Sequence, residues 1–286
     1  MNILQQQSRF NSVTRKNWEL FASHRERTTD LICESFGRSQ RPAANSSLAI
    51  LGAGNGNDLD LKTLAAKFAK IHLFDFDATA LEYLQAEQLN DPQTAQSVVI
   101  EPPVDLTGAA IELESLTGKL TEAQAVELGA KLQSVNHVLP DRTFDLVVST
   151  CLLTQLLNHV VHCVGQEAEF KNYLMIKIRD GHLKLMSQLI RPAGVGVLVT
   201  DFVCSDTLPE LNEATTDQAV LKLSRKAIEN RNFFTGANPW AVKDSLAKMI
   251  QEPPDLPWSI APPWRWKIGP RRSFAVTAIS FSAVRA

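Results

Sequence analysis

Three glycines occupy alternate positions, as Gly52, Gly54 and Gly56, directly after the short apolar run 48–51. Glycine allows a sharp turn there and lets a ligand approach the backbone without meeting a Cβ atom. A helical pattern begins beyond the turn, and the free N–H groups of a helix N-terminus attract a carboxylate or a phosphate. Asp75 lies 23 residues after Gly52, at the expected end of the next strand, where a carboxylate can accept both hydroxyls of a ribose. The pattern predicts a site for a nucleoside-containing ligand.

Two classes of nucleoside ligand fit such a turn. A dinucleotide fingerprint needs G-x-G-x-x-G, whereas the sixth position here is Asn57, and Asp58 and Asp60 follow at once. Carboxylates beside a pyrophosphate would repel it, but a ligand that carries an amino group and a sulfonium tolerates them. A tight strand-to-helix turn that binds nothing is a third interpretation.

Histidine and cysteine lie on one face of a predicted helix at His159, His162 and Cys163. Three such groups can ligate zinc, but one helix offers few suitable angles and no fourth ligand lies nearby, so we predict no metal. His159 and His162 are candidates for a catalytic general base, and packing inside the core is the alternative.

Two groups of side chains are candidates for a substrate pocket. The same predicted helix carries neutral polar residues that either line such a pocket or face solvent, at Thr154, Gln155 and Asn158. The segment before the first strand carries aromatic side chains that could wall it, at Trp18, Phe21 and His24. Arg25 in this segment could form a bidentate pair with a carboxylate of the bound ligand. An amphipathic helix with a solvated arginine is the alternative.

Aromatic and basic residues mix near the end of the chain, at 264–267 and 271–272, as they do on surfaces that bind single-stranded nucleic acid. A charged edge hairpin is the simpler explanation, because 29 basic residues stand against 31 acidic ones. No apolar run approaches the roughly 20 residues that span a bilayer. Four scattered cysteines and a polar start favour a soluble, cytoplasmic protein. We expect a small-molecule partner, and neither nucleic acid nor a membrane.

The elements that must position these residues alternate between strands and helices. Helical patterns, one of them at 109–133, separate apolar runs of strand length at 47–51, 71–74, 98–104, 144–149 and 195–200. Pro102 and Pro103 break the third of these runs. This alternation predicts an α/β fold with a mostly parallel sheet and helices on both faces. Residues 264–281 alternate like an antiparallel pair of strands. We expect an N-terminal helical cap or lid at 1–45 and a domain at 46–286 that ends in a helical insert and this hairpin.

Five stretches in order carry a resemblance to a known family: 48–56 (LAILGAGNG), 74–81 (FDFDATAL), 104–107 (VDLT), 144–149 (FDLVVS) and 189–198 (LIRPAGVGVL). They resemble the ordered motifs of class I S-adenosylmethionine-dependent methyltransferases, over about residues 46 to 201. The resemblance implies a Rossmann-like, seven-stranded, mostly parallel sheet preceded by extra N-terminal helices. It also implies S-adenosyl-L-methionine as the cofactor and S-adenosyl-L-homocysteine as its product.

The resemblance assigns roles to single residues. It places the methionine part of the cofactor at the glycine turn, with Gly52, Ala53, Gly54, Gly56 and Asp58. It gives the ribose hydroxyls to Asp75 and the adenine to Phe76, Asp105 and Leu106. It puts the end of the fourth strand beneath the sulfonium, with Ser149, Thr150 and Cys151. The chain departs from the family pattern at Ile50, where an acidic residue often stands, and in an insert at about 107–140.

Methyl transfer from a sulfonium is an in-line displacement that asks the protein chiefly to align the reactants and exclude water. Enzymes that methylate bases or glutamine carry an Asn/Asp-Pro-Pro-aromatic motif where this chain has residues 151–155, which argues against methylation of nucleic-acid bases. We therefore expect a methyltransferase that acts on an O or N atom of a small molecule. A non-catalytic cofactor-binding scaffold and an NAD(P)-dependent oxidoreductase are the alternatives.

Overall fold

The described residues form one eight-stranded sheet. The chain is described from a computed structural model over residues 2–37, 42, 45–116, 119–250 and 258–282. The strands are β1 (Ser47–Leu51), β2 (Lys70–Phe74), β3 (Val98–Ile100), β4 (Phe144–Thr150), β5 (Ile190–Cys204), β6 (Ser259–Ile260), β7 (Trp264–Gly269) and β8 (Arg272–Ser282). Their order is β3-β2-β1-β4-β5-β8-β6, and β7 pairs with β8 outside this row. Strands β1 to β5 pair in parallel and β8 is antiparallel to its neighbours, which confirms the predicted Rossmann-like sheet and C-terminal hairpin.

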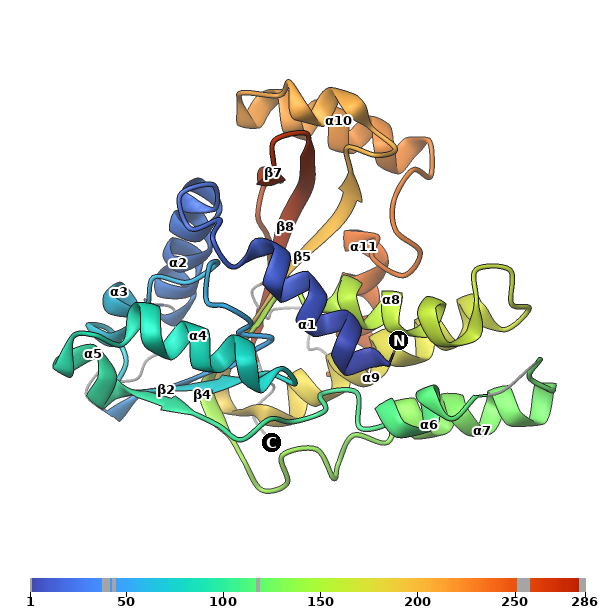
Figure 1. The fold of residues 1–286 in the computed structure, drawn as a ribbon, viewed down its shortest axis with the longest axis horizontal. Helices are drawn as coiled ribbons and strands as arrows, with labels where there is room; N and C mark the ends of the chain where they lie inside the picture. Colours follow the sequence, from blue (N-terminus) through green and yellow to red (C-terminus); the bar gives the residue numbers. More distant parts are fainter. Residues whose placement is uncertain (1, 38–41, 43–44, 117–118, 251–257, 283–286) are drawn as a thin grey trace.

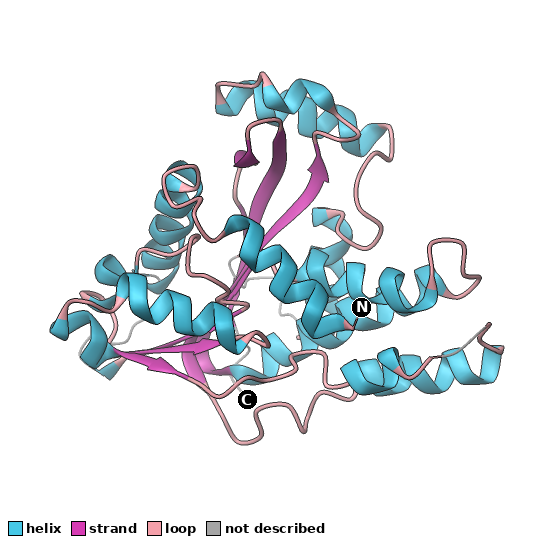
Figure 2. Ribbon diagram, in the orientation of Figure 1, coloured by secondary structure: helices cyan, strands magenta, loops and turns pink. Residues whose placement is uncertain are grey.

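Helices lie on both sides of the strands (Figures 1 and 2). Within the described part they are α1 (Ile3–Thr14), α2 (Ala22–Gly37), α3 (Leu61–Ala65), α4 (Ala78–Gln88), α5 (Pro92–Ser97), α6 (Ala110–Glu114), α7 (Glu122–Gln133), α8 (Leu153–Val164), α9 (Lys171–Leu189), the 3-10 helix η2 (Pro209–Asn212), α10 (Asp217–Glu229) and α11 (Pro239–Met249). No helix among the described residues is long and apolar enough to cross a membrane.

Strand β1 shows why both faces of the sheet need cover. Leu48 and Ile50 are buried in a cluster that includes side chains of α2, α3 and α4. Ala49 and Leu51 are buried in a second cluster with side chains of α6 to α9. Successive residues of a strand point to opposite faces, so a continuous apolar run is stable only between two layers of helices.

Three element boundaries differ from the sequence-based expectation. Strand β3 covers only the part of the 98–104 run before the expected break and ends at Ile100, because Pro102 and Pro103 lack the N–H groups that a ladder requires. Strand β5 is longer than expected, since its antiparallel partner β8 extends it to Cys204. The helix expected over 109–133 is two helices, α6 and α7. The expected boundary at residue 45 adjoins residues 38–41 and 43–44, which lie outside the described part.

The parallel register brings the candidate site residues to one edge of the sheet. Leu51, the last residue of β1, is level with Phe74 on one side and Ser149 on the other. The residues that follow these positions, Gly52, Asp75 and Thr150, therefore meet at the carboxyl ends of neighbouring strands, which is where ligands bind in open α/β sheets.

Candidate functional site

The alternating glycines form the turn that leaves β1. Gly52, Gly54 and Gly56 have φ angles of +80°, +50° and +72°, in the left-handed region that glycine adopts readily. The backbone N–H of Gly52 donates to the carbonyl of Phe74 at 2.9 Å, which ties the turn to the end of β2. The turn is thus rigid, and its backbone groups are presented in a defined direction.

Asp75 closes this turn from the neighbouring strand. Its Oδ2 accepts a hydrogen bond from the N–H of Gly54 at 2.7 Å, and its Oδ1 accepts one from the N–H of Asp77 at 2.9 Å. Burial raises the pKa of Asp75 to about 6, and these backbone donors oppose the rise. Each carboxylate oxygen can accept a further bond, so Asp75 retains the capacity to receive hydroxyl donors.

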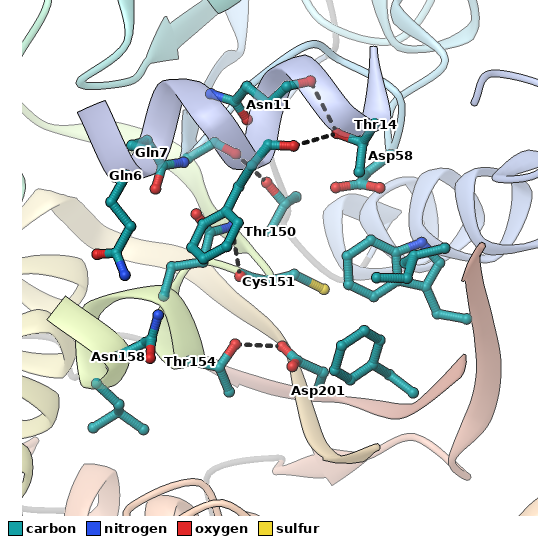
Figure 3. Close-up of a pocket in the computed structure, with 18 of the residues that line it drawn as sticks. Gln6, Gln7, Asn11, Thr14, Asp58, Thr150, Cys151, Thr154, Asn158 and Asp201 are labelled. Carbon is teal, nitrogen blue, oxygen red and sulfur yellow. Dashed lines mark hydrogen bonds between the residues drawn. The ribbon is translucent and has the colours of Figure 1, made fainter. Parts of the chain in front are cut away.

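A cavity of about 950 Å³ opens from the turn and extends to the start of α8, to β5 and to the β7–β8 hairpin. It brings together twelve of the predicted site residues: Gly52, Ala53, Gly54, Gly56, Asp58, Asp75, Thr150, Cys151, Phe21, Thr154, Gln155 and Asn158. Figure 3 shows Thr154, Cys151 and Asp201 on one side of this space and α1 on the other. The sequence-based grouping of the glycine turn with the start of α8 therefore corresponds to one continuous hollow.

The residues expected near the adenine do not line the cavity in the described part of the chain. Asp105 accepts bonds from the N–H of Thr107 at 2.8 Å and from the N–H of Ala110 at 2.8 Å, so it caps the turn that leads into α6. Leu106 is buried in the core, and Phe76 is partly buried and packs against this core. The Oγ of Ser149 lies 2.8 Å from Nε2 of His182, away from the cavity. The contacts of Phe76, Asp105 and Leu106 with an adenine, and the place of Ser149 beneath the sulfonium, stay predictions.

The aromatic segment before the sheet contributes less to the cavity than predicted. Phe21 lines it, but Trp18, His24 and Arg25 do not. Nη1 of Arg25 donates to the carbonyls of Trp18 at 2.8 Å and Asn57 at 3.1 Å, and its guanidinium lies 3.5 Å from the centre of the Trp18 ring. Through these contacts Arg25 holds the end of the glycine turn in place. Its pairing with a ligand carboxylate stays a prediction.

His24 is a neutral side chain buried behind the cavity wall. Nε1 of Trp264 donates to its Nδ1 at 3.0 Å, which leaves the ring proton on Nε2. Burial lowers the pKa of His24 to about 3, with a smaller effect of Arg25 in the same direction. Its Nε2 lies 3.5 Å from Oδ1 of Asp58, so it faces that carboxylate without a close hydrogen bond.

The two candidate bases on α8 lie away from the cavity. His159 is buried, neither of its ring nitrogens has a hydrogen-bond partner among the described residues, and burial lowers its pKa to about 4. His162 is exposed. Neither lines the cavity, so a catalytic role for either stays a prediction that this placement does not support. The described residues contain no cluster of three or more His, Cys, Asp or Glu that could hold a metal ion.

Two carboxylates, the buried Asp201 and the half-buried Asp58, line the cavity together with Cys151. Oδ1 of Asp201 accepts a bond from Oγ1 of Thr154 at 2.6 Å, whereas Oδ1 of Asp58 has no hydrogen-bond partner among the described residues. Burial raises the pKa of Asp58 to about 7 and that of Asp201 to about 6. Burial and the two carboxylates also raise the pKa of Cys151 well above its usual value. Cys151 is thus a thiol at neutral pH and a poor nucleophile.

The sequence analysis expected a helical cap at 1–45 but assigned no residue of α1 to the site. This helix crosses between α4 and α8 in Figure 1 and packs on α4. Its residues Gln6, Gln7, Asn11 and Thr14 line the cavity. The start of this helix is indicated by the sequence, because Asn2 and Gln5 form a capping box. This local signal does not indicate where the helix packs relative to the site.

Asparagine side chains attach α1 to the glycine turn. Nδ2 of Asn55 donates to the carbonyl of Asn11 at 2.7 Å, and Nδ2 of Asn57 donates to the carbonyl of Thr14 at 2.8 Å. In addition, Nδ2 of Asn11 donates to Oδ2 of Asp77, the N-cap residue of α4, at 2.9 Å. The turn and the helix thus form one wall of the cavity.

Most of the buried side-chain atoms that line the cavity without a hydrogen-bond partner are acceptor oxygens. Among the described residues that line it, acceptor oxygens without a partner belong to Gln6, Gln7, Asn55, Asp58 and Gln155, and the unpartnered donor is Nε1 of Trp266. Buried acceptors cost free energy unless a donor reaches them. The cavity therefore suits a ligand that brings N–H or O–H donors to these oxygens.

The strand order β3-β2-β1-β4-β5-β8-β6, with β8 antiparallel to a row of parallel strands, is typical of one fold. The chain has a Rossmann-like fold with the strand order of class I methyltransferases. No protein-family model matches its sequence, and no curated protein is significantly similar to it.

Solved structures with this methyltransferase fold resemble the chain distantly. They include the N-methyltransferase NodS from Bradyrhizobium japonicum in complex with S-adenosyl-L-homocysteine, at 14% identity and a TM-score of 0.46 over 99% of both chains. The methyltransferase SibL is 13% identical, with a TM-score of 0.42 over 87% of this chain, and DesVI of Streptomyces venezuelae is 12% identical, with a TM-score of 0.35 over 66%. This chain spans about half the length of the latter two, 52% of each. Likenesses this distant bear on neither cofactor nor acceptor.

Proposed function

We propose that this protein is an S-adenosylmethionine-dependent methyltransferase that transfers a methyl group to an O or N atom of a small molecule. The observation that carries the proposal is the glycine turn whose middle N–H is bound by Asp75 and which opens into the 950 Å³ cavity. A Cβ atom added at Gly54 would meet only Oδ1 of Asn11, at 3.4 Å, so the backbone there faces open space.

The donor and acceptor groups present fit this cofactor. The free acceptor capacity of Asp75 suits the ribose hydroxyls, and the unpartnered Oδ1 of Asp58 suits the α-ammonium group. When bound, the cofactor supplies an electrophilic methyl group on sulfur. The protein's own part is to orient the acceptor along the line of the breaking bond, to exclude water and to neutralise charge.

The same features count against a nicotinamide dinucleotide. A pyrophosphate at the turn would lie near the carboxylates of Asp58 and Asp75, which line the cavity there. Anionic phosphates need N–H donors or cations, and they are repelled by carboxylates.

Calorimetric titration with S-adenosylmethionine, S-adenosylhomocysteine and NADH tests the proposal. We expect micromolar binding of the two sulfur ligands, no binding of NADH, and loss of binding in Asp75→Ala and in the isosteric Asp75→Asn. The exposed Asp244→Asn serves as the matched control that binds normally. Binding of NADH alone would overturn the proposal. Binding of the sulfur ligands without methyl transfer to any acceptor in a broad screen would favour the non-catalytic scaffold.

A further inference from the structure

We propose that the methyl acceptor is a cationic amine, whose ammonium group binds the carboxylate of Asp201 and packs against the aromatic wall formed by Trp266, Phe274 and Phe234. This inference rests on the proposed function, because it names the substrate class of the same cavity. It uses a buried carboxylate and an aromatic wall that cofactor binding leaves unassigned.

Asp201 is an acid buried at the cavity surface, and no described cation lies within ion-pair distance of its carboxylate. Its residue surface is 4% exposed, and its side-chain hydrogen bond comes from the neutral hydroxyl of Thr154. Arg272 also lines the cavity, and its charge opposes the rise in the pKa of Asp201, but its ion pair is with Asp206 at 3.2 Å, and both of these side chains are exposed. A buried carboxylate is stabilised best by a paired charge, and a ligand cation would supply it.

The aromatic side chains that line the same cavity as Asp201 form a continuous wall, and the guanidinium of Arg272 already lies 5.4 Å from the centre of the Phe274 ring. The ring centres of Trp266 and Phe274 are 5.6 Å apart, and those of Phe274 and Phe234 are 6.2 Å apart. Phe21 continues the wall at 5.2 Å from Trp266. Aromatic faces attract cations, most strongly where water is excluded. A carboxylate next to such faces is an arrangement that recognises an ammonium group.

The distribution of charged side chains along the cavity also favours a cationic ligand. Its carboxylates, Asp58, Asp75 and Asp201, lie inside, whereas Arg9 and Arg272 are exposed at its rim. Lys171 is half-buried and donates to the carbonyl of Gln166. An anionic acceptor would meet carboxylates in the interior, and a neutral alcohol would leave the charge of Asp201 uncompensated.

Asp201 also has the position to take a proton. An ammonium nitrogen has no free lone pair, so one proton must pass to the carboxylate of Asp201 before a bond can form. The nitrogen pair then forms the N–C bond while the S–C bond breaks and its electron pair stays on sulfur. The positive charge passes from sulfur to the methylated nitrogen, and the proton on Asp201 leaves to solvent with the product.

Calorimetry on the protein saturated with S-adenosylhomocysteine tests this inference with matched probes: 2-phenylethylamine, 2-phenylethanol and phenylacetate, followed by hexylamine, hexanol and hexanoate. We expect each amine to bind about tenfold or more tightly than its alcohol, and the carboxylates not to bind. In Asp201→Asn the amine and the alcohol should bind within about twofold of each other, while Asp244→Asn should keep the preference. Trp266→Leu should weaken the binding of the amines and not that of the alcohols.

Equal binding of amine and alcohol by the wild-type protein would overturn the inference, as would binding of the carboxylates or no binding of any amine. An amine preference that persists in folded Asp201→Asn would also overturn it. The comparison of probes on the wild-type protein needs no variant, so it decides the matter even where a variant fails to fold. Failure of S-adenosylhomocysteine itself to bind would instead refute the proposed function.

Discussion

The side-chain amide of Asn57 donates a hydrogen bond to the backbone carbonyl of Thr14 at 2.8 Å, across 43 positions of sequence. Thr14 is the last residue of α1, whose final carbonyls have no partner within the helix. The Thr14 carbonyl also accepts a hydrogen bond from the N–H of Asn17 at 2.9 Å, so the bond from Asn57 adds a second donor and ties the helix end to the glycine turn. Cavity wall and candidate cofactor site are coupled through this contact.

Asn57→Ala should loosen α1 while leaving the sheet intact. Loss of one buried hydrogen bond costs about 1 kcal/mol, and this cost should appear as faster amide hydrogen exchange confined to residues 3–14. Asn90→Ala is the control, because Asn90 makes a comparable side-chain bond to the carbonyl of Glu87 on the surface. Unchanged exchange in α1 of Asn57→Ala would show that other contacts hold the helix.

Gly54→Ala and Gly56→Ala should separate binding from stability. Both positions have positive φ, but a Cβ at Gly56 would lie 2.5 Å from Nε2 of Gln88 and 2.7 Å from Cδ1 of Leu84. We expect Gly54→Ala to cost about 1 kcal/mol of unfolding free energy and Gly56→Ala about 2–4 kcal/mol. Gly54→Ala should still lose S-adenosylhomocysteine affinity, because its Cβ would enter the space between the turn and α1. Urea denaturation and calorimetry measure the two effects, and the opposite order of stabilities would contradict the geometry.

Asp58→Asn should stabilise the ligand-free protein at neutral and higher pH. Burial raises the pKa of Asp58 from 3.8 to about 7, so the folded state binds more protons than the unfolded state between these values. Stability from this group is then lost as pH rises from about 4 to about 7. At pH 8 the variant should exceed the wild type in unfolding free energy by on the order of 2 kcal/mol, with little difference at pH 4. For the control Asp244→Asn, the difference in unfolding free energy from the wild type should be the same at pH 8 and pH 4. A difference for Asp58→Asn that is also the same at both pH values would contradict the raised pKa of Asp58.

Gln6→Leu should leave the ligand-free protein as stable as the wild type or more so, and weaken ligand binding. The Gln6 side chain is buried at the cavity and its Oε1 has no partner in the described structure, so the substitution removes an unsatisfied acceptor. If a bound ligand satisfies that oxygen, the affinity for S-adenosylhomocysteine or for the amine probes should fall about tenfold. Gln85→Leu on the exposed face of α4 is the control. A loss of stability without a loss of affinity would assign Gln6 a structural role.

Local sequence determined the parts of the site that lie within one strand–turn–helix unit or at the ends of adjacent parallel strands. Alternating apolar runs require a sheet covered on both faces, and the glycines and Asp75 follow two such runs directly. Their meeting was predictable because parallel strands that pair in register end at the same edge. Pro102 and Pro103 likewise shortened β3 for a local reason, the absence of N–H donors.

Tertiary structure alone decided what covers this edge and which charges face the cavity. Helical periodicity shows that 3–14 and 22–37 can be helices, but not that α1, rather than the segment with Trp18 and Arg25, lies over the site. That choice depends on asparagine side chains that reach backbone carbonyls more than 40 positions away. Asp201 stands in an apolar strand run with no motif around it, and it reaches the cavity only because β5 pairs with β8 beyond the parallel core. Packing between distant segments set its burial and brought the aromatic side chains to the same cavity.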